Sequence, residues 1–130
     1  MSKNLSRIFL NTIDKNSSLE IIGSKINNKW SSTDRKQLLY MVNYCSEILK
    51  QRGINKGDRV SYKGKNSIEF IAWNLATYNL GGIWVPMYSD QNKKYCQYII
   101  NDCNPKLLIT DDTIEIKNTE IISNKITPIE

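Results

Sequence analysis

Between residues 57 and 110, two patterns of apolar and polar positions alternate, and this stretch organises the chain. Three short runs have the pattern of strands: residues 58–62, 83–87 and 106–110, of which 83–87 is fully apolar. Two segments between them place apolar residues at the spacing of a helix: residues 67–80 and 92–102. Helices that connect continuous apolar strands are typical of an α/β fold. We therefore expect a mostly parallel sheet with helices on both faces, joined by right-handed crossovers.

A further helix is predicted ahead of this unit, from residues 31–34 to about Arg52. Its apolar residues recur every three or four positions: Leu38, Met41, Val42, Cys45, Ile48 and Leu49. A Ser or Thr hydroxyl at residues 31–33 is expected to accept a free backbone N–H, while Asp34 adds a favourable charge to the helix start. Gly53 is a natural residue to follow the helix.

The ends of the two later helices are also marked in the sequence. Asn66, with Glu69 three residues on, has the spacing of a capping box, and Asn104-Pro105 stops the helix over residues 92–102. Gly81-Gly82 follows a helix and precedes a strand, which favours a helix-stop role over a phosphate loop. The helix over residues 67–80 is apolar nearly all round, which predicts burial between layers of a domain larger than this chain.

The 130 residues are expected to form a single partial domain. Residues 1–30 form an N-terminal extension, residues 31–110 the α/β core, and residues 111–130 short strands or a frayed tail. Residues 8–10 are expected to form one helical turn against the core. Three shorter runs are candidate strands: residues 19–22, 113–116 and 119–123.

Composition narrows the class of protein. The chain is 40% hydrophobic and 24% charged, as in globular proteins, and no apolar run approaches the ~18 residues of a membrane span. Residues 1–10 lack the apolar core and cleavage site of a signal peptide. We therefore expect a cytoplasmic protein without a transmembrane segment.

The net charge of +5 is unevenly spread. Residues 1–65 carry 13 Lys/Arg against 5 Asp/Glu, whereas residues 66–130 carry 5 against 8. The basic residues form no dense cluster, so a solvated, mildly basic surface is favoured and no nucleic-acid partner is expected. Contact with an acidic partner surface, a phosphate-bearing ligand or an acidic remainder of the protein stays open as an alternative.

Candidate catalytic chemistry is sparse. Cys45, Cys96 and Cys103 lack pairing spacing and are expected to be reduced thiols in or near the core. Because the chain has no His, it excludes Cys-His pairs, Ser-His-Asp triads and His-containing zinc sites. The sequence contains neither the G-x-G-x-x-G motif nor the G-x-x-x-x-G-K-[ST] motif, the two common glycine-rich motifs that bind phosphates. Asp111-Asp112 has no third carboxylate nearby, so a solvated loop is favoured over a metal site.

Five aromatic residues lie in the organising stretch: Trp73, Trp84, Tyr88, Tyr95 and Tyr98. Core packing is favoured for them over a stacking platform for a base or an acyl chain. Tyr88 is the best candidate for an aromatic that faces a pocket, because it follows the carboxyl end of a predicted strand.

The order of several short motifs resembles the N-terminal region of AMP-forming acyl-CoA synthetases, the adenylating superfamily. These motifs are Gly-Asp-Arg-Val at 57–60, Asn-Ser-Ile-Glu-Phe at 66–70, Gly-Gly-Ile-Trp-Val-Pro at 81–86, Tyr-Ile-Ile-Asn-Asp-Cys at 98–103 and Lys-Leu-Leu-Ile-Thr at 106–110. Within this superfamily, the motif Val-Pro-Met-Tyr at 85–88 most resembles the corresponding sequence of the long-chain fatty acyl-CoA ligases. The first family motif is only partly kept, since residues 32–38 retain the cap and the Leu but not the Tyr-x-Glu.

The resemblance implies a two-step reaction, in which ATP and a carboxylate give acyl-AMP and CoA then displaces AMP. ATP, Mg and CoA are implied for a full-length member. The family's phosphate loop, adenine and magnesium segment, ribose Asp and catalytic Lys come later in its sequence, and none occurs here. No catalytic, cofactor-binding or metal-binding residue can therefore be assigned to this chain, and no cofactor is expected to bind it alone.

The leading hypothesis is an N-terminal fragment of, or truncated protein similar to, a long-chain fatty acid–CoA ligase, inactive alone. Its partner would be the remainder of a split or truncated ligase, or further copies in a homo-oligomer. The alternative is a non-catalytic α/β interaction module derived from such an enzyme.

Overall fold

The computed structural model describes residues 20–26 and 29–127. Its elements follow in the order β1 (Glu20–Ile26), β2 (Lys29–Asp34), α2 (Arg35–Gln51), β3 (Arg59–Lys63), α3 (Ile68–Asn79), β4 (Ile83–Met87), α4 (Lys93–Cys103), β5 (Leu107–Thr110) and β6 (Glu120–Ile122). The helical turn expected at residues 8–10 lies outside the described residues. None of the described helices is long and apolar enough to cross a membrane.

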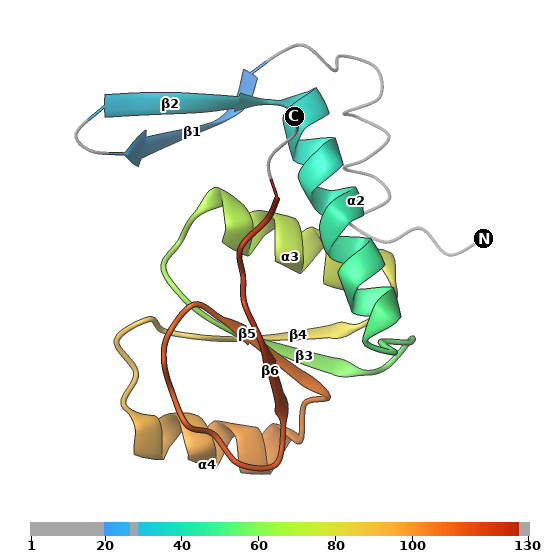
Figure 1. Cartoon of the computed structure of the whole chain (residues 1–130), viewed down its shortest axis with the longest axis vertical. Coiled ribbons are helices and arrows are strands. Elements are labelled where there is room, and N and C mark those ends of the chain that lie inside the picture. Colours follow the sequence, from blue (N-terminus) through green and yellow to red (C-terminus); the bar gives the residue numbers. More distant parts are fainter. Residues whose placement is uncertain (1–19, 27–28, 128–130) are drawn as a thin grey trace.

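A four-stranded sheet forms the centre of the fold, with strand order β4-β3-β5-β6 and all three pairings parallel. Figure 1 shows α2 and α3 on one side of this sheet and α4 on the other. The connection from β4 through α4 passes beyond β3 to reach β5. The predicted α/β class, a mostly parallel sheet with helices on both faces, is confirmed.

Strand β5 shows why the sheet needs helices on both sides. Leu107 and Ile109 belong to the cluster formed with α2 and α3, whereas Leu108 belongs to a second cluster with Cys96 and Ile100 of α4. All four residues of β5 are buried. Because successive side chains of a strand point to opposite faces, a continuous apolar run is stable only in a sheet that is covered twice.

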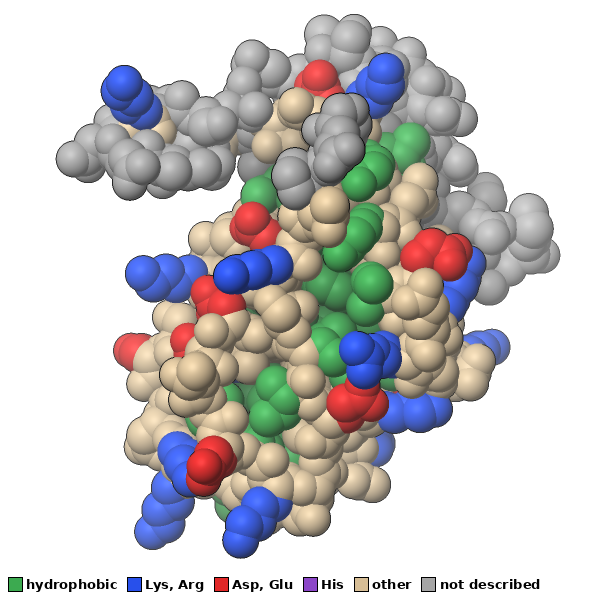
Figure 2. Space-filling model, in the orientation of Figure 1, with side chains coloured by type: hydrophobic (Ala, Val, Ile, Leu, Met, Phe, Trp, Pro, Cys, Tyr) green, Lys and Arg blue, Asp and Glu red, His purple; other side chains and the backbone are tan. Residues whose placement is uncertain are grey.

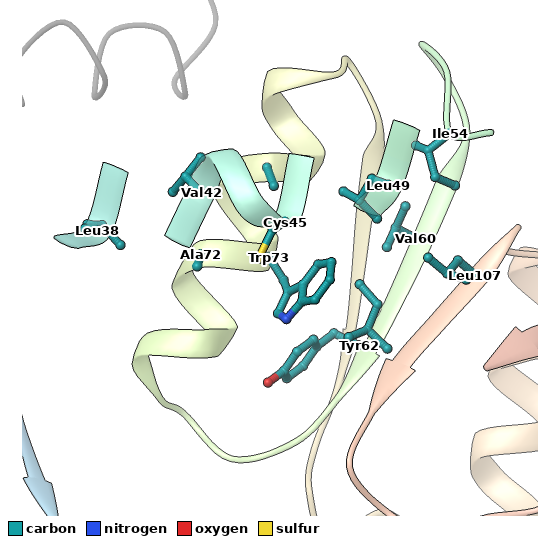
Figure 3. Close-up of a cluster of buried hydrophobic side chains, with 12 residues drawn as sticks. Leu38, Val42, Cys45, Leu49, Ile54, Val60, Tyr62, Ala72, Trp73 and Leu107 are labelled. Atoms are coloured by element: carbon teal, nitrogen blue, oxygen red, sulfur yellow. The ribbon is translucent and has the colours of Figure 1, made fainter. Parts of the chain in front are cut away.

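The larger core lies between the sheet and the helices α2 and α3. Trp73 of α3 is 1% exposed and lies between Cys45 of α2 and Tyr62 of β3 (Figure 3). At the margin of this core the rings of Tyr62, Phe70 and Trp84 form a trio, with centroids 5.2–5.4 Å apart. Edge-to-face contacts of this kind add to the free energy of apolar burial. Core packing is confirmed for Trp73 and Trp84.

Two helix starts differ from the prediction by one or more residues. The N-cap of α2 is Asp34 itself: its carboxylate accepts the Gln37 N–H at 2.8 Å, and the Gln37 side chain returns the bond to Asp34 N–H. The prediction of a Ser or Thr cap was wrong, because β2 holds residues 29–34 in a hairpin with β1. The N-cap of α3 is Ser67, whose hydroxyl accepts the Phe70 N–H at 3.2 Å, and not Asn66.

The predicted helix stops are confirmed at two glycines. Gly53 follows the C-cap of α2 with φ +79°, and Gly81 follows the C-cap of α3 with φ +74°. Both values lie in the left-handed region, which costs little only for glycine. Gly82 N–H then bonds to Thr77 O at 2.9 Å, so the turn out of α3 satisfies a terminal carbonyl.

Three other predictions need correction. Residues 113–116 form no strand, whereas residues 120–122 do, as β6 paired to β5. The candidate strand at residues 19–22 continues past Gly23 to Ile26, and its residue 19 lies outside the described residues. Tyr95 does not face the core: it is 49% exposed, because Cys96 and Ile100 turn inward against Leu108.

Asp58, just before β3, provides a pH-dependent contribution to stability. Its carboxylate accepts the Asn55 N–H at 2.7 Å, which lowers the pKa of Asp58, and Lys106 Nζ at 3.3 Å adds to this effect. A carboxyl whose pKa is lowered by folding stabilises the chain above its unfolded pKa of about 3.9, and this stabilisation is lost as the pH falls through the folded pKa.

We expect Asp58→Asn to lower stability near neutral pH and to flatten the decline in stability below about pH 4. Urea unfolding over a pH series measures both effects. Lys106→Met should retain most of the acid-dependent decline, because the Asn55 backbone bond is the larger cause. An Asp58→Asn chain with the wild-type pH profile would contradict this assignment.

Candidate functional site

The carboxyl ends of the parallel strands meet at one edge of the sheet and surround an open cleft of about 710 Å³. Its lining comes from the segments after β3, β4, β5 and β6 and from the start of α3: Gly64, Lys65, Ser67, Glu69, Ser89, Asp90, Asp111, Asp112, Asn124 and Lys125. Open α/β sheets bind their ligands at this edge. Parallel pairing thus brings together residues that are up to 61 positions apart in sequence.

Lys63, the last residue of β3, connects the end of its own strand to the segments that follow β4 and β5. Its side chain is 5% exposed, and its ammonium group forms an ion pair with Asp112 and donates to Ser89 O at 2.7 Å. Asp112 N–H in turn bonds to the hydroxyl of Thr110 at 3.1 Å. A buried cation needs such partners, so Lys63 positions the loops after β4 and β5 relative to each other.

Asn124, beyond β6, anchors the opposite wall of the cleft. Its side-chain Nδ2 donates to the hydroxyl of Tyr62 at 2.9 Å, and its backbone carbonyl accepts the indole N–H of Trp73 at 2.8 Å. Burial raises the pKa of Tyr62, although the bond from Asn124 opposes this shift. The hydroxyl of Tyr62 therefore stays protonated and serves to position Asn124.

Neither Lys63 nor Asn124 was identified from the sequence. The alternation of side chains along β3 could have indicated the burial of Lys63. Val60 and Tyr62 face the core with α2 and α3, so Ser61 and Lys63 point to the opposite face, which α4 covers. No comparable local signal existed for Asn124, whose partners lie 51 and 62 positions away.

The three tyrosines among the five aromatic residues considered above lie in two places. Tyr88 is 79% exposed and lines a second, neighbouring cleft of about 490 Å³ with Phe70, Pro86 and Met87, as expected for a residue after a strand end. Tyr95 and Tyr98 lie on the outer side of α4, 49% and 64% exposed, with ring centroids 6.0 Å apart. Core packing was therefore the wrong prediction for Tyr95 and Tyr98, whereas Tyr88 lines a cleft as predicted.

Burial lowers the reactivity of two of the three thiols. Cys45 and Cys96 are buried and Cys103 is half-buried, and all three are free. Burial raises the pKa of the Cys45 thiol strongly, and it also raises that of Cys96, where the nearby charge of Lys63 opposes the shift. Because the thiolate is the reactive form, Cys45 and Cys96 are inert core residues.

The charges that line the main cleft do not suit a triphosphate. Four carboxylates face two lysines there, and the charge of Lys63 is already matched by Asp112. The lining of this cleft therefore carries more negative than positive charge, which would repel a phosphate-rich ligand. Within residues 20–26 and 29–127, no three His, Cys, Asp or Glu side chains gather closely enough to hold a metal ion. Figure 2 shows Lys and Arg spread around the outline of one face, without a dense basic patch among the described residues.

Comparison with known proteins places this arrangement in a family. Residues 18–129 match the family described as AMP-binding enzyme. The chain is 25% identical over 118 residues to the mouse long-chain-fatty-acid–CoA ligase ACSBG2, covering 91% of this chain and 18% of that ligase. It is 27% identical over 105 residues to human ACSBG1, covering 81% of this chain and 14% of the ligase. The chain thus spans less than a fifth of these relatives.

Solved structures share the fold. The N-terminal subdomain of Klebsiella oxytoca NpsA, in complex with 3-hydroxybenzoyl-AMSN, superposes with a TM-score of 0.81 at 20% identity, over 95% of this chain and 30% of that one. CmiS6 gives a TM-score of 0.83 at 19% identity, over 92% of this chain and 32% of its own. Since the family match covers nearly the whole sequence and the fold is shared with the N-terminal subdomain of NpsA, the chain belongs to the AMP-binding enzyme family and resembles the N-terminal part of its acyl-CoA ligases.

Proposed function

We propose that this chain is the N-terminal part of an ATP-dependent, AMP-forming long-chain fatty acid–CoA ligase that works in the cytoplasm. In this proposal the 130 residues form a partial domain that is inactive alone. The observation that carries the proposal is the family match over residues 18–129, combined with the similarity to ligases whose names specify long-chain fatty acids.

The geometry of the cleft supports inactivity of the isolated chain. Lys63 and Asn124 use their polar groups to hold the loops of the sheet edge in place. Ser67, a hydroxyl in the cleft lining, already accepts a backbone bond as a helix cap. These residues shape a wall of a site, and the groups that act on ATP and the carboxylate must come from elsewhere in the enzyme.

The test is a pyrophosphate-release assay of the 130-residue chain with ATP, Mg²⁺ and palmitate, followed by addition of CoA. We expect release at the level of a heat-denatured control, because the four carboxylates and two lysines that line the main cleft do not suit the triphosphate of ATP. Mouse ACSBG2 under the same conditions provides the positive control. Sustained turnover by the 130 residues would contradict the claim of inactivity.

One observation favours a second candidate, a non-catalytic interaction module. Both faces of the sheet are already covered, by α2 and α3 on one side and α4 on the other. A self-standing module should unfold in one cooperative transition. The codons after Glu130 separate the candidates: a Ser/Thr/Gly-rich loop ending in Lys-Gly supports the ligase, and an in-frame stop supports the module.

A further inference from the structure

The outer surface of α4 differs in charge from the main cleft. A groove of about 770 Å³ there is lined by residues of α4 and of the segment 115–117. Its lining includes three lysines, Lys93, Lys94 and Lys117, against a single carboxylate, that of Glu115. The main cleft has the opposite balance, with four carboxylates against two lysines. An anionic partner is therefore favoured at α4 and disfavoured at the main cleft.

The positive charges of this groove are not neutralised within the described part of the chain. Lys94 and Lys117 are exposed, and neither forms an ion pair with a described residue. Lys93 lies 3.7 Å from Glu115, but their side chains are 62% and 96% exposed, and such a pair is weak. Asp102, exposed in the last turn of α4, bounds the basic surface at its far end. The lysines can therefore interact with a partner.

Gln97 holds the loop lysine against the helix. Its side-chain Nε2 donates to Lys117 O at 3.0 Å, and its Oε1 accepts the Lys117 N–H at 2.8 Å. The preceding residue, Ile116, is 9% exposed and packs in the same cluster as Cys96 and Ile100 of α4. The loop and the helix therefore present their lysines on one surface.

Two exposed aromatic rings adjoin these lysines. Tyr95 and Tyr98 are 49% and 64% exposed, with ring centroids 6.0 Å apart. Tyr98 also lines the groove, and it follows Lys94 by one helical turn. Tyrosine is enriched at membrane–water interfaces, because its ring is apolar and its hydroxyl is polar, and lysines on the same surface attract anionic lipids. A soluble anion would use the lysines alone, whereas an anionic bilayer uses both the lysines and the rings.

We propose that the outer surface of α4, formed by Lys93, Lys94, Tyr95, Tyr98 and Lys117, binds reversibly to anionic lipid bilayers. The lysines contact the phospholipid head groups, and the tyrosine rings enter the head-group layer. Figure 1 shows α2 and α3 on the other side of the sheet, so neither of these helices covers this surface. Because a carboxylate offsets one of the three lysines, the binding is weak. This contact goes beyond the proposed ligase function and does not depend on it.

The experiment measures co-sedimentation of the 130-residue chain with vesicles at low salt. We expect partitioning onto an equimolar mixture of phosphatidylserine and phosphatidylcholine, and none onto phosphatidylcholine alone. Lys94→Gln combined with Lys117→Gln should lower the partition coefficient about 25-fold, since each lysine near an anionic surface contributes about fivefold. Lys36→Gln combined with Lys50→Gln is the matched control: it removes the same charge from exposed positions on α2, across the sheet, and should change partitioning by about twofold or less.

A second pair of substitutions tests the rings. Tyr95→Ser combined with Tyr98→Ser keeps every charge and removes the apolar surface, so partitioning onto the anionic vesicles should fall about threefold or more. Both residues are exposed on α4, so the helical circular dichroism signal of the variant should match that of the wild-type chain.

Several results would overturn the proposal. Equal losses in the two double-lysine variants would show that net charge, and not this surface, attracts the chain to lipid. Partitioning that survives loss of both tyrosines would remove the rings from the contact. Displacement from vesicles by soluble glycerophosphoserine would assign the lysines to a free anion. Retention on poly-L-glutamate without binding to any vesicle would assign the surface to an acidic protein.

Discussion

Trp73→Ala should destabilise the chain by about 3–5 kcal/mol, the usual range for removing a buried Trp. Trp73 is 1% exposed and contacts residues of α2, α3 and β3, so its loss leaves a cavity where two helices meet the sheet. The substitution also leaves Asn124 O without the indole N–H that bonds to it at 2.8 Å. Total stability of a domain is only about 5–15 kcal/mol, so this single change removes a large share of it.

Urea unfolding followed by far-UV circular dichroism measures the effect. Trp73→Phe is the matched control, because it keeps an aromatic ring in the core and removes the indole N–H. We expect it to cost about 1–2 kcal/mol. If Trp73→Ala cost no more than Trp73→Phe, the indole would not be the centre of this core.

Asp112→Asn should destabilise the chain by about 1–3 kcal/mol, and it should cost more than Lys63→Met. The reason is the unequal burial of the pair: the Lys63 side chain is 5% exposed, whereas that of Asp112 is 42% exposed. Asparagine keeps an oxygen that can accept from Lys63, but it removes the negative charge that neutralises this buried cation. Removing the lysine leaves a carboxylate that water can solvate, which is why we place the cost below that of a fully buried pair.

A double-mutant cycle isolates the interaction. Lys63→Met combined with Asp112→Asn should cost less than the sum of the two single changes, because the double variant buries no unpaired charge. Glu115→Gln provides the comparison for an exposed pair: Lys93 and Glu115 lie 3.7 Å apart with side chains 62% and 96% exposed, so its effect should stay within about 0.5 kcal/mol. Equal effects of Asp112→Asn and Glu115→Gln would show that Lys63 does not depend on its partner.

Much of the fold was predictable, because the spacing of apolar residues within a short segment indicates whether that segment forms a helix or a strand. The apolar run Ile83–Met87 coincides with β4, and the helix expected from residues 31–34 to about Arg52 is α2. Glycine identified two helix ends, because left-handed backbone strongly selects it. The helix starts were less certain, since several polar residues in a row can each act as a cap, and neighbouring structure selects one of them. At α2 the hairpin β1–β2 selected Asp34.

Little of the candidate site was predictable from the sequence. Tyr88 was expected at a strand end and lines a cleft. Lys63 was counted among scattered surface charges, yet it is nearly fully buried. Asp112 was expected in a solvated loop, and its role as the partner of Lys63 depends on the meeting of two strand ends. Tyr95 could face either side of α4 by its spacing, and the contact of Cys96 and Ile100 with Leu108 decided its exposure.

The sequence by itself determined the strands and helices of the α/β unit, its parallel character and its family, because each of these follows from periodicity and short ordered motifs. The tertiary structure decided the strand order β4-β3-β5-β6, the burial of Lys63 and the anchoring role of Asn124. It also decided that β4 and β6 are the edge strands of this sheet among the residues that the structure describes. These features depend on pairings between segments far apart in the chain, which local patterns do not encode: only the packed sheet brings Lys63, Ser89 and Asp112 together and leaves the apolar strand β4 on the outside.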